Sequence, residues 1–224
     1  MPAAFVDERA RTALRDAVVA VEAQSSAEIV IAVRRQSAAY LHTNLVVGAC
    51  VSFAALAYML GASTPFSLTA ILVDPFALGV AAALLAELVA PLKRYLTPAQ
   101  HRRRTVERAA RATFVERGVH GTTGRTGILV YASWVERHAT LVCDLGVLAA
   151  MPPSSLAAAG ERVQAAMRRD GAALAAAVAQ LGPELARYLP RSADDVNERP
   201  DDVDAHAGRR ARATAPPPTT GGAA

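Results

Sequence analysis

The sequence predicts a mixed α/β domain that is interrupted by a pair of membrane-spanning helices. Two long apolar stretches, residues 45–62 and 68–92, follow one another in an otherwise water-soluble chain of 224 residues. At ~1.5 Å per residue the first stretch is ~27 Å long, close to the ~30 Å thickness of a bilayer core. Segments with helical spacing of apolar residues, and short β-branched runs, occur on both sides of this pair.

The first soluble segment is expected to form a helix and then a strand. Apolar residues with helical spacing lie at Val6, Ala10, Leu14, Val18 and Val21. Residues 28–33 read E-I-V-I-A-V, a run typical of a strand that is covered on both faces. The chain therefore passes from helix to strand before it enters the apolar hairpin.

Within the hairpin, Asp74 and Pro75 are predicted to cap and begin a second helix that runs to about Leu92. Glu87 falls near the far end of this helix and is interpreted as an interfacial carboxylate, with a role in an ion pathway as the alternative. Two buried helices of a soluble domain are the alternative for the whole hairpin. The short linker, residues 63–67, and the charged flanks argue against that alternative.

The charges beside the hairpin predict its orientation. Arg34 and Arg35 precede it, the linker has no basic residue, and a basic segment, residues 93–111, follows it. By the positive-inside rule, both flanks and both termini are expected in the cytoplasm, with the hairpin in a bacterial inner membrane. No secretory signal precedes Asp7, which agrees with a cytoplasmic N-terminus.

The net charge of +4 comes largely from this basic segment. Five of its residues are expected to contact anionic lipid headgroups, namely Lys93, Arg94, Arg102, Arg103 and Arg104. A solvated helix face is the alternative. Nucleic-acid binding is disfavoured because no aromatic residues alternate with the arginines.

After the hairpin, Thr97 and Pro98 are expected to begin a helix that ends at Gly118. Residues 121–127, G-T-T-G-R-T-G, suggest a phosphate-binding loop, but they precede a strand instead of joining a strand to a helix, so a flexible lead-in is favoured. Residues 128–133 and 139–143 predict a β-hairpin, and residues 155–169 and 172–188 predict two closing helices. From Pro190 the chain turns acidic, and residues 205–224 are expected to be a disordered tail.

The cysteines and histidines indicate no metal site or disulfide. Cys50 lies in the first apolar stretch and Cys143 in a predicted strand, so their pairing is not expected. The five histidines show no spacing of four residues with one another or with cysteine, and a zinc site is not indicated.

Four segments together resemble the TPM domain family, in particular its bacterial integral-membrane branch. They are S-S-A-E-I-V-I-A-V (25–33), R-T-G-I-L-V-Y-A-S (125–133), E-R-H-A-T-L-V-C-D-L-G (136–146) and L-G-P-E-L-A-R-Y-L-P-R-S-A-D-D-V-N-E-R-P-D (181–201). The resemblance implies an α/β/α sandwich with a small mixed sheet, built from residues 1–42 and 97–204 around a transmembrane hairpin at 43–96. It also relates the chain to thylakoid-lumen proteins of photosystem repair. Some members of the family are similar to acid phosphatases, some are thought to bind divalent metal, and others are accessory proteins.

A phosphatase-like hydrolase would need a nucleophile or an activated water, and groups that stabilise a phosphoryl group. The candidates for catalysis are Asp144, Glu136 and Arg125, with Thr122 and Thr123 as candidates for phosphate binding. Asp144 is also the candidate ligand for a calcium or magnesium ion. Each has an ordinary alternative as a turn former or solvated group.

The acidic segment offers a different function. Asp194, Asp195 and Glu198 could meet a basic partner or a cation, with a solvated linker as the alternative. A membrane-anchored accessory or interaction module is therefore favoured, with the phosphatase as the second possibility. The sequence gives little support for a transporter or channel, since the two apolar stretches lack a polar stripe that could line a pathway.

Overall fold

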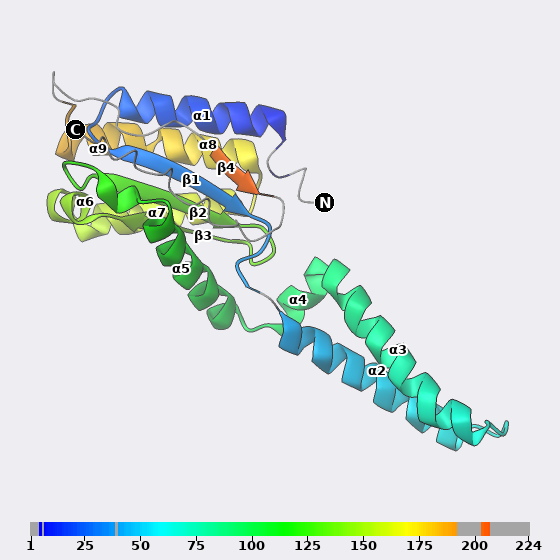
Figure 1. Cartoon of the computed structure of the whole chain (residues 1–224). Coiled ribbons are helices and arrows are strands. Elements are labelled where there is room, and N and C mark those ends of the chain that lie inside the picture. Colours follow the sequence, from blue (N-terminus) through cyan, green and yellow to red (C-terminus); the bar gives the residue numbers. More distant parts are fainter. Residues whose placement is uncertain (1–4, 6, 39, 192–202, 207–224) are drawn as a thin grey trace, which may run out of the picture.

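A computed structural model of the protein describes residues 5, 7–38, 40–191 and 203–206. In these residues helices cover both faces of a four-stranded sheet, and two long helices project from one end of this domain (Figure 1). The projecting helices follow the first strand in the chain and separate it from the other three. The prediction of an α/β domain interrupted by an apolar helical pair is confirmed.

The sheet is mixed, with strand order β3-β2-β1-β4. β1 (Glu28–Arg34) is parallel to β2 (Gly127–Ser133) and to β4 (Val203–His206), whereas β3 (His138–Cys143) is antiparallel to β2. β2 has a strand on each side and helices on both faces, so all seven of its residues are buried. The apolar, β-branched character of the two central strands follows from this position.

The larger core lies on one face of the sheet. It is covered by α1 (Glu8–Glu22), α7 (Pro153–Met167), α8 (Gly171–Ala179) and α9 (Leu181–Tyr188), with Val147 of α6 (Leu145–Ala150) at its side. Leu14, Ile31, Val130 and Leu174 are fully buried there. Burying one such side chain stabilises a fold by roughly 1.5–3 kcal/mol, so this face contributes most to the stability of the domain.

The smaller core lies on the opposite face. α5 (Ala99–Glu116) and the short helix η2 (Val119–Gly121) cover it, and Val106 and Phe114 of α5 contact Leu129 and Tyr131 of β2. Helices on both faces make the domain an α/β/α sandwich. This arrangement follows from the alternation along β2, where successive residues point to opposite faces.

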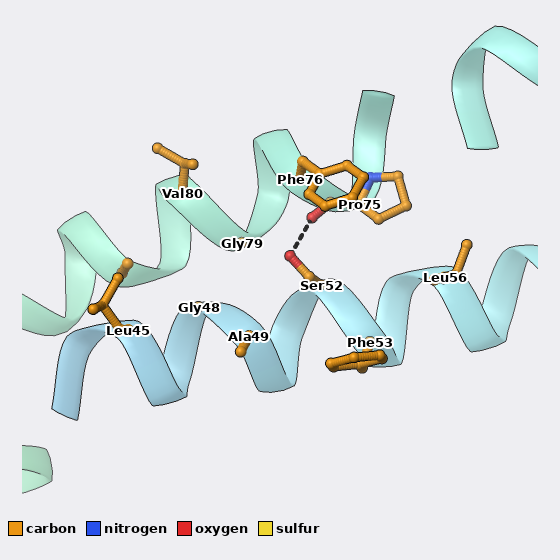
Figure 2. A pocket seen from close by; sticks show the side chains of 11 residues that line it. Leu45, Gly48, Ala49, Ser52, Phe53, Leu56, Pro75, Phe76, Gly79 and Val80 are labelled. Carbon is orange, nitrogen blue, oxygen red and sulfur yellow. Dashed lines mark hydrogen bonds between the residues drawn. The ribbon is translucent and has the colours of Figure 1, made fainter. Parts of the chain in front are cut away.

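The apolar hairpin consists of α2 (Leu41–Gly61) and α3 (Leu68–Leu88). The two helices cross where Gly48 faces Gly79, and a Cβ on Gly48 would lie 2.7 Å from the Gly79 carbonyl oxygen. Beside the crossing, Ser52 Oγ donates a 2.8 Å hydrogen bond to the carbonyl of Pro75 (Figure 2). An apolar groove of about 420 Å³ runs along this contact. Small residues allow the backbones to approach closely, as is typical of helices packed in lipid.

The predicted start of the second apolar helix at Asp74 and Pro75 is wrong. α3 begins at Leu68, where Ser67 Oγ accepts a hydrogen bond from the Ala70 N–H, and Pro75 lies inside the helix. Proline has no N–H to donate to the carbonyl of Ile71, four residues earlier, so one helical hydrogen bond is lost, a loss that helices packed in lipid tolerate. After α3 the chain forms a separate short helix, α4 (Ala90–Leu96), before α5.

At the C-terminal side, the predicted helix at 172–188 is divided into α8 and α9, and Pro183 falls in the first turn of α9, where proline is tolerated. The sequence did not predict β4. The predicted disordered tail starts at Ala205, inside this strand, and its residues 207–224 lie outside the described part.

Candidate functional site

The candidate residues from the sequence divide between the two ends of the β2–β3 hairpin. At one end the Asp144 N–H donates to the Gly127 carbonyl, and at the other Ser133 is paired with His138. The six steps along the strand from Gly127 to Ser133, at ~3.3 Å each, separate these ends by ~20 Å. Glu136 lies in the turn beyond Ser133, so it does not share a site with Asp144.

Asp144 caps the N-terminus of α6. Its Oδ1 accepts a 2.8 Å hydrogen bond from the Leu145 N–H. The side chain is buried, and its Oδ2 has no hydrogen-bond partner within the described residues. A buried carboxylate with one unpartnered oxygen could accept a hydrogen bond from a ligand or contact a cation, and this atom is the strongest chemical feature at this end.

The glycine-rich segment beside Asp144 is an ordered turn, not a flexible lead-in. Thr122 Oγ1 accepts from the Thr126 N–H at 3.0 Å, and the Thr122 carbonyl accepts from the Arg125 N–H at 3.0 Å. Arg125 has a positive φ of 51°, and its carbonyl accepts from the Gly146 N–H. The buried Thr122 hydroxyl is thus used by the fold, whereas the Thr123 and Arg125 side chains are exposed.

This end of the sheet therefore brings together Asp144, Thr122, Thr123 and Arg125. Across the described residues, no three His, Cys, Asp or Glu side chains lie close enough to form a metal site. Asp194, Asp195 and Glu198 lie outside the described residues. A metal at Asp144 would need its other ligands from backbone carbonyls or water, which is a chemistry that calcium and magnesium accept.

At the other end of the hairpin, Glu136 is the centre of a buried network. Its Oε1 accepts from the Ser37 N–H at 3.0 Å and from the Tyr40 hydroxyl at 2.6 Å, and its Oε2 accepts from the Ser133 hydroxyl. The side chain is 3% exposed. With three donors on its two oxygens, Glu136 joins the end of β1, the β2–β3 turn and the start of α2.

The tyrosine hydroxyls of this network stay protonated. Burial, followed by the hydrogen bond to Glu136, raises the pKa of Tyr40 well above its ordinary value. Burial also raises the pKa of Tyr131, whose hydroxyl lies 3.2 Å from Ser37 Oγ. Tyr40, Ser37 and Ser133 were not recognised from the sequence. The signal that could have found Tyr40 is its place directly before an apolar helix.

A second buried carboxylate fixes β4 to the sheet. Asp204 forms ion pairs with Arg34 of β1 at 2.7 Å and with Arg117 after α5. Arg34 also donates to the Asp204 carbonyl at 3.1 Å. Burial lowers the pKa of Arg34. Asp204 belongs to the predicted acidic segment, and in the described structure it serves the fold.

The hairpin base contains a polar pair. Asn44, in the first turn of α2, donates from Nδ2 to Glu87 Oε2 near the end of α3 at 2.6 Å. The Asn44 side chain is buried, and its Oδ1 has no hydrogen-bond partner in the described structure. Glu87 therefore pairs locally at the end of the hairpin that is close to the domain.

The arginines predicted to bind headgroups differ in environment. Arg94 is half-buried and lies 5.7 Å from the centroid of the Trp134 ring. Arg102 is half-buried and donates to the carbonyls of Arg94 and Thr97. Arg103 pairs with Glu107 at 2.8 Å, and Arg104 is exposed. The Lys93 side chain lies outside the described atoms.

Comparisons with known proteins identify the fold only. No protein-family model matches the chain, and no curated protein matches it. The chain is similar to the NMR structure of the BA42 protein from the psychrophilic bacterium Bizionia argentinensis, with a TM-score of 0.55 and 14% sequence identity. The likeness covers 90% of this chain and 96% of that one. At this identity it establishes a shared fold.

Proposed function

We propose that the protein is an integral membrane member of the TPM domain family whose α/β domain acts as an accessory, partner-binding module at the cytoplasmic face. Insertion into a membrane is supported by the exposure of the apolar hairpin. α2 and α3 have 21 residues each, and only 11% of the apolar window of either helix is buried. At ~1.5 Å per residue each helix is ~32 Å long, enough to cross a bilayer core.

The shared fold with BA42 is compatible with a TPM-type domain. Arg34, Arg35 and the arginines of α4 and α5 flank the hairpin, and the linker between its helices has none, which favours a cytoplasmic domain. The accessory role is supported by Glu136 and Thr122, since both are occupied by hydrogen bonds within the fold. Groups held in this way favour a scaffold over a hydrolase.

Two experiments test the proposal. A reporter that is active only outside the cytoplasm, fused to either terminus in living cells, is expected to remain inactive, and activity at either end would contradict the orientation. Chemical cross-linking in intact membranes is expected to join the domain to another protein. Recovery of the uncross-linked chain with lipid alone would contradict the partner-binding role.

The second candidate function is a phosphatase-like hydrolase, and one observation favours it. Asp144 has a buried, unpartnered Oδ2 beside the turn that contains Thr122, Thr123 and Arg125. The carboxylate would act as a nucleophile or hold a calcium or magnesium ion, and Arg125 would contact phosphate oxygens. This function predicts release of phosphate from a generic ester by the purified chain and loss of that activity in Asp144→Asn. Equal activity of the variant would reject it.

A further inference from the structure

We propose that Arg94, Arg102 and Arg137 together bind the phosphate of one anionic phospholipid headgroup at the base of the hairpin. These residues are called the arginine triad below. The inference rests on the proposed membrane insertion and deepens it, because it assigns one defined lipid site where the sequence predicted only a general basic surface. It also adds Arg137, which lies 26 residues beyond the end of the predicted basic segment at residue 111.

The triad is assembled from three elements around Trp134. The Arg94 guanidinium of α4 lies 5.7 Å from the Trp134 ring centroid, and the backbone N–H of Arg137, whose side chain is exposed, donates to the Trp134 carbonyl at 3.3 Å. Arg102 of α5 donates to the carbonyls of Arg94 and Thr97 and so holds α4 against α5. The β2–β3 turn, α4 and α5 therefore meet at one place close to the start of α2 (Figure 1).

The triad has no direct ion pair within the described part of the chain. None of its three guanidinium groups is within 4.0 Å of a carboxylate among the residues that the structure describes. The pKa of Arg94 is lowered by burial and then by the charges of Arg137 and Arg102. Like charges held together are unfavourable unless an anion joins them. A phosphate, which guanidinium groups bind through paired hydrogen bonds, would relieve this repulsion.

Donors without acceptors lie at the same place. Arg94 Nε and Thr97 Oγ1 are buried and have no hydrogen-bond partner in the described structure, and Thr97 is 2% exposed. A buried donor that lacks an acceptor costs ~1–3 kcal/mol. Arg94 Nε can only donate and the Thr97 hydroxyl can donate as well as accept, so both can donate to the oxygens of a phosphate, whose bonding capacity is mainly that of an acceptor.

The position of the triad identifies a lipid as the source of that phosphate. α3 ends at Leu88, and Arg94 lies six residues further along the chain in the separate helix α4, a span of ~9 Å at the helical rise of 1.5 Å per residue. The headgroup layer on each side of a bilayer is ~5–8 Å thick. Tyr95 is 89% exposed beside the triad, and aromatic side chains are enriched at this depth.

The test uses the full chain in a neutral detergent. Native mass spectrometry counts retained lipids after addition of phosphatidylglycerol or phosphatidylcholine, and the fluorescence of Trp134, the only tryptophan in the sequence, follows the same titrations. One phosphatidylglycerol is expected to be retained selectively. Arg137→Asn and Arg94→Gln are expected to weaken its binding about tenfold, the loss of one charge-assisted contact. Asn is chosen at position 137 because it tolerates the positive φ of 49° found there.

Arg111→Gln is the matched control, since Arg111 is an exposed arginine on α5 that belongs neither to the triad nor to the five residues predicted to contact headgroups, and it is expected to bind as the parent chain does. Equal loss in the control, or no preference for phosphatidylglycerol, would overturn the inference. Competition by millimolar inorganic phosphate as effective as that of the lipid would assign the site to a soluble anion and overturn the lipid assignment. Extraction of the chain from membranes by alkaline carbonate would instead contradict the proposed insertion, so the two failures are distinguishable.

Discussion

The buried carboxylates of this protein differ in how completely the fold uses them. Glu136 accepts three hydrogen bonds and Asp204 has two arginine partners, whereas Asp144 has one oxygen that accepts no hydrogen bond from any described group. Residue type and burial alone do not separate these cases. The number of donors around each oxygen does, because an oxygen that already holds donors in a fixed network is not available to a substrate.

Replacing Glu136 with Gln is expected to destabilise the domain by about 2–3 kcal/mol. The amide keeps the shape of the side chain but turns one acceptor into a donor that faces other donors, and buried unsatisfied groups are costly. Urea unfolding in micelles, followed by Trp134 fluorescence, measures the change. Glu107→Gln is the control, since it breaks only a surface pair with Arg103 and is expected to cost below ~0.5 kcal/mol. Equal costs for the two variants would contradict the role of Glu136.

The acid sensitivity of the domain is expected to depend on His138. Burial, followed by the charge of Arg103, lowers the pKa of this half-buried side chain below 6.5. Below pH 6.5 the unfolded chain therefore binds more protons than the folded chain, and the free energy of unfolding falls with falling pH until the lowered pKa is reached. In His138→Gln this part of the loss is expected to disappear when urea unfolding at pH 7.5 and pH 5 is compared. An unchanged difference would contradict the assignment.

The Glu136 network could not be predicted from the sequence because its partners are distant from Glu136 in the chain. Ser37 and Tyr40 lie almost 100 residues before Glu136 in the chain, and the pairing of β1 with β2 brings them together. No local spacing records such a contact. Asp144 was recognised because its position at a strand end is local, although its unpartnered oxygen is a property of the folded structure alone.

At the scale of elements, periodicity predicted most of the fold. β1, β2 and β3 are continuous apolar runs, and α1 and α5 have clear helical stripes. β4 was missed because V-D-A-H, although it alternates apolar and polar residues, is only four residues long, and its pairing with β1 is supported by the Asp204 ion pairs, which are tertiary contacts. The start of α3 was misplaced because Ser67 and Asp74 are both suitable caps, and local preference alone does not choose between them.

The crossing of α2 and α3 is expected to depend on Gly79. A Cβ at this position would lie 2.0 Å from Ser52 Oγ and 2.7 Å from the Gly48 carbonyl oxygen, so Gly79→Ala is expected to separate the helices by about 1 Å or more. Gly61→Ala is the matched control, because a Cβ there meets nothing within 4 Å.

Pulsed EPR measures this separation. Spin labels on Cys50 of α2 and on a cysteine introduced by Val80→Cys report the distance between the helices, in a chain where Cys143 is replaced by Ser. The label positions are on exposed side chains. A distance distribution in Gly79→Ala that matches that of the Gly61→Ala control would show that the close glycine contact does not determine the crossing.

At the scale of the whole molecule, the hairpin is an insertion in the sequence: it follows β1 and precedes the other three strands of the sheet. Insertion at this place requires that the two chain segments entering and leaving the hairpin lie close together. They do, since the ring centroids of His42 and His101 are 6.2 Å apart. The division of the chain into two halves around an apolar pair was predictable from hydropathy, whereas the closeness of the two junctions depends on tertiary structure.

Removal of the hairpin is therefore expected to leave a folded, water-soluble domain. Replacing residues 43–97 with about five Gly and Ser residues spans up to ~16 Å, more than the short gap at the junction requires. The variant keeps Tyr40, Glu136 and both cores, so it is expected to remain monomeric and to unfold cooperatively in urea, with Trp134 as the reporter. Because it loses the Arg94 contact with Trp134, its urea midpoint of unfolding is expected to be modestly lower than that of the full chain. Aggregation, or a broad transition without a folded baseline, would show that the sheet needs the hairpin to bring its two halves together.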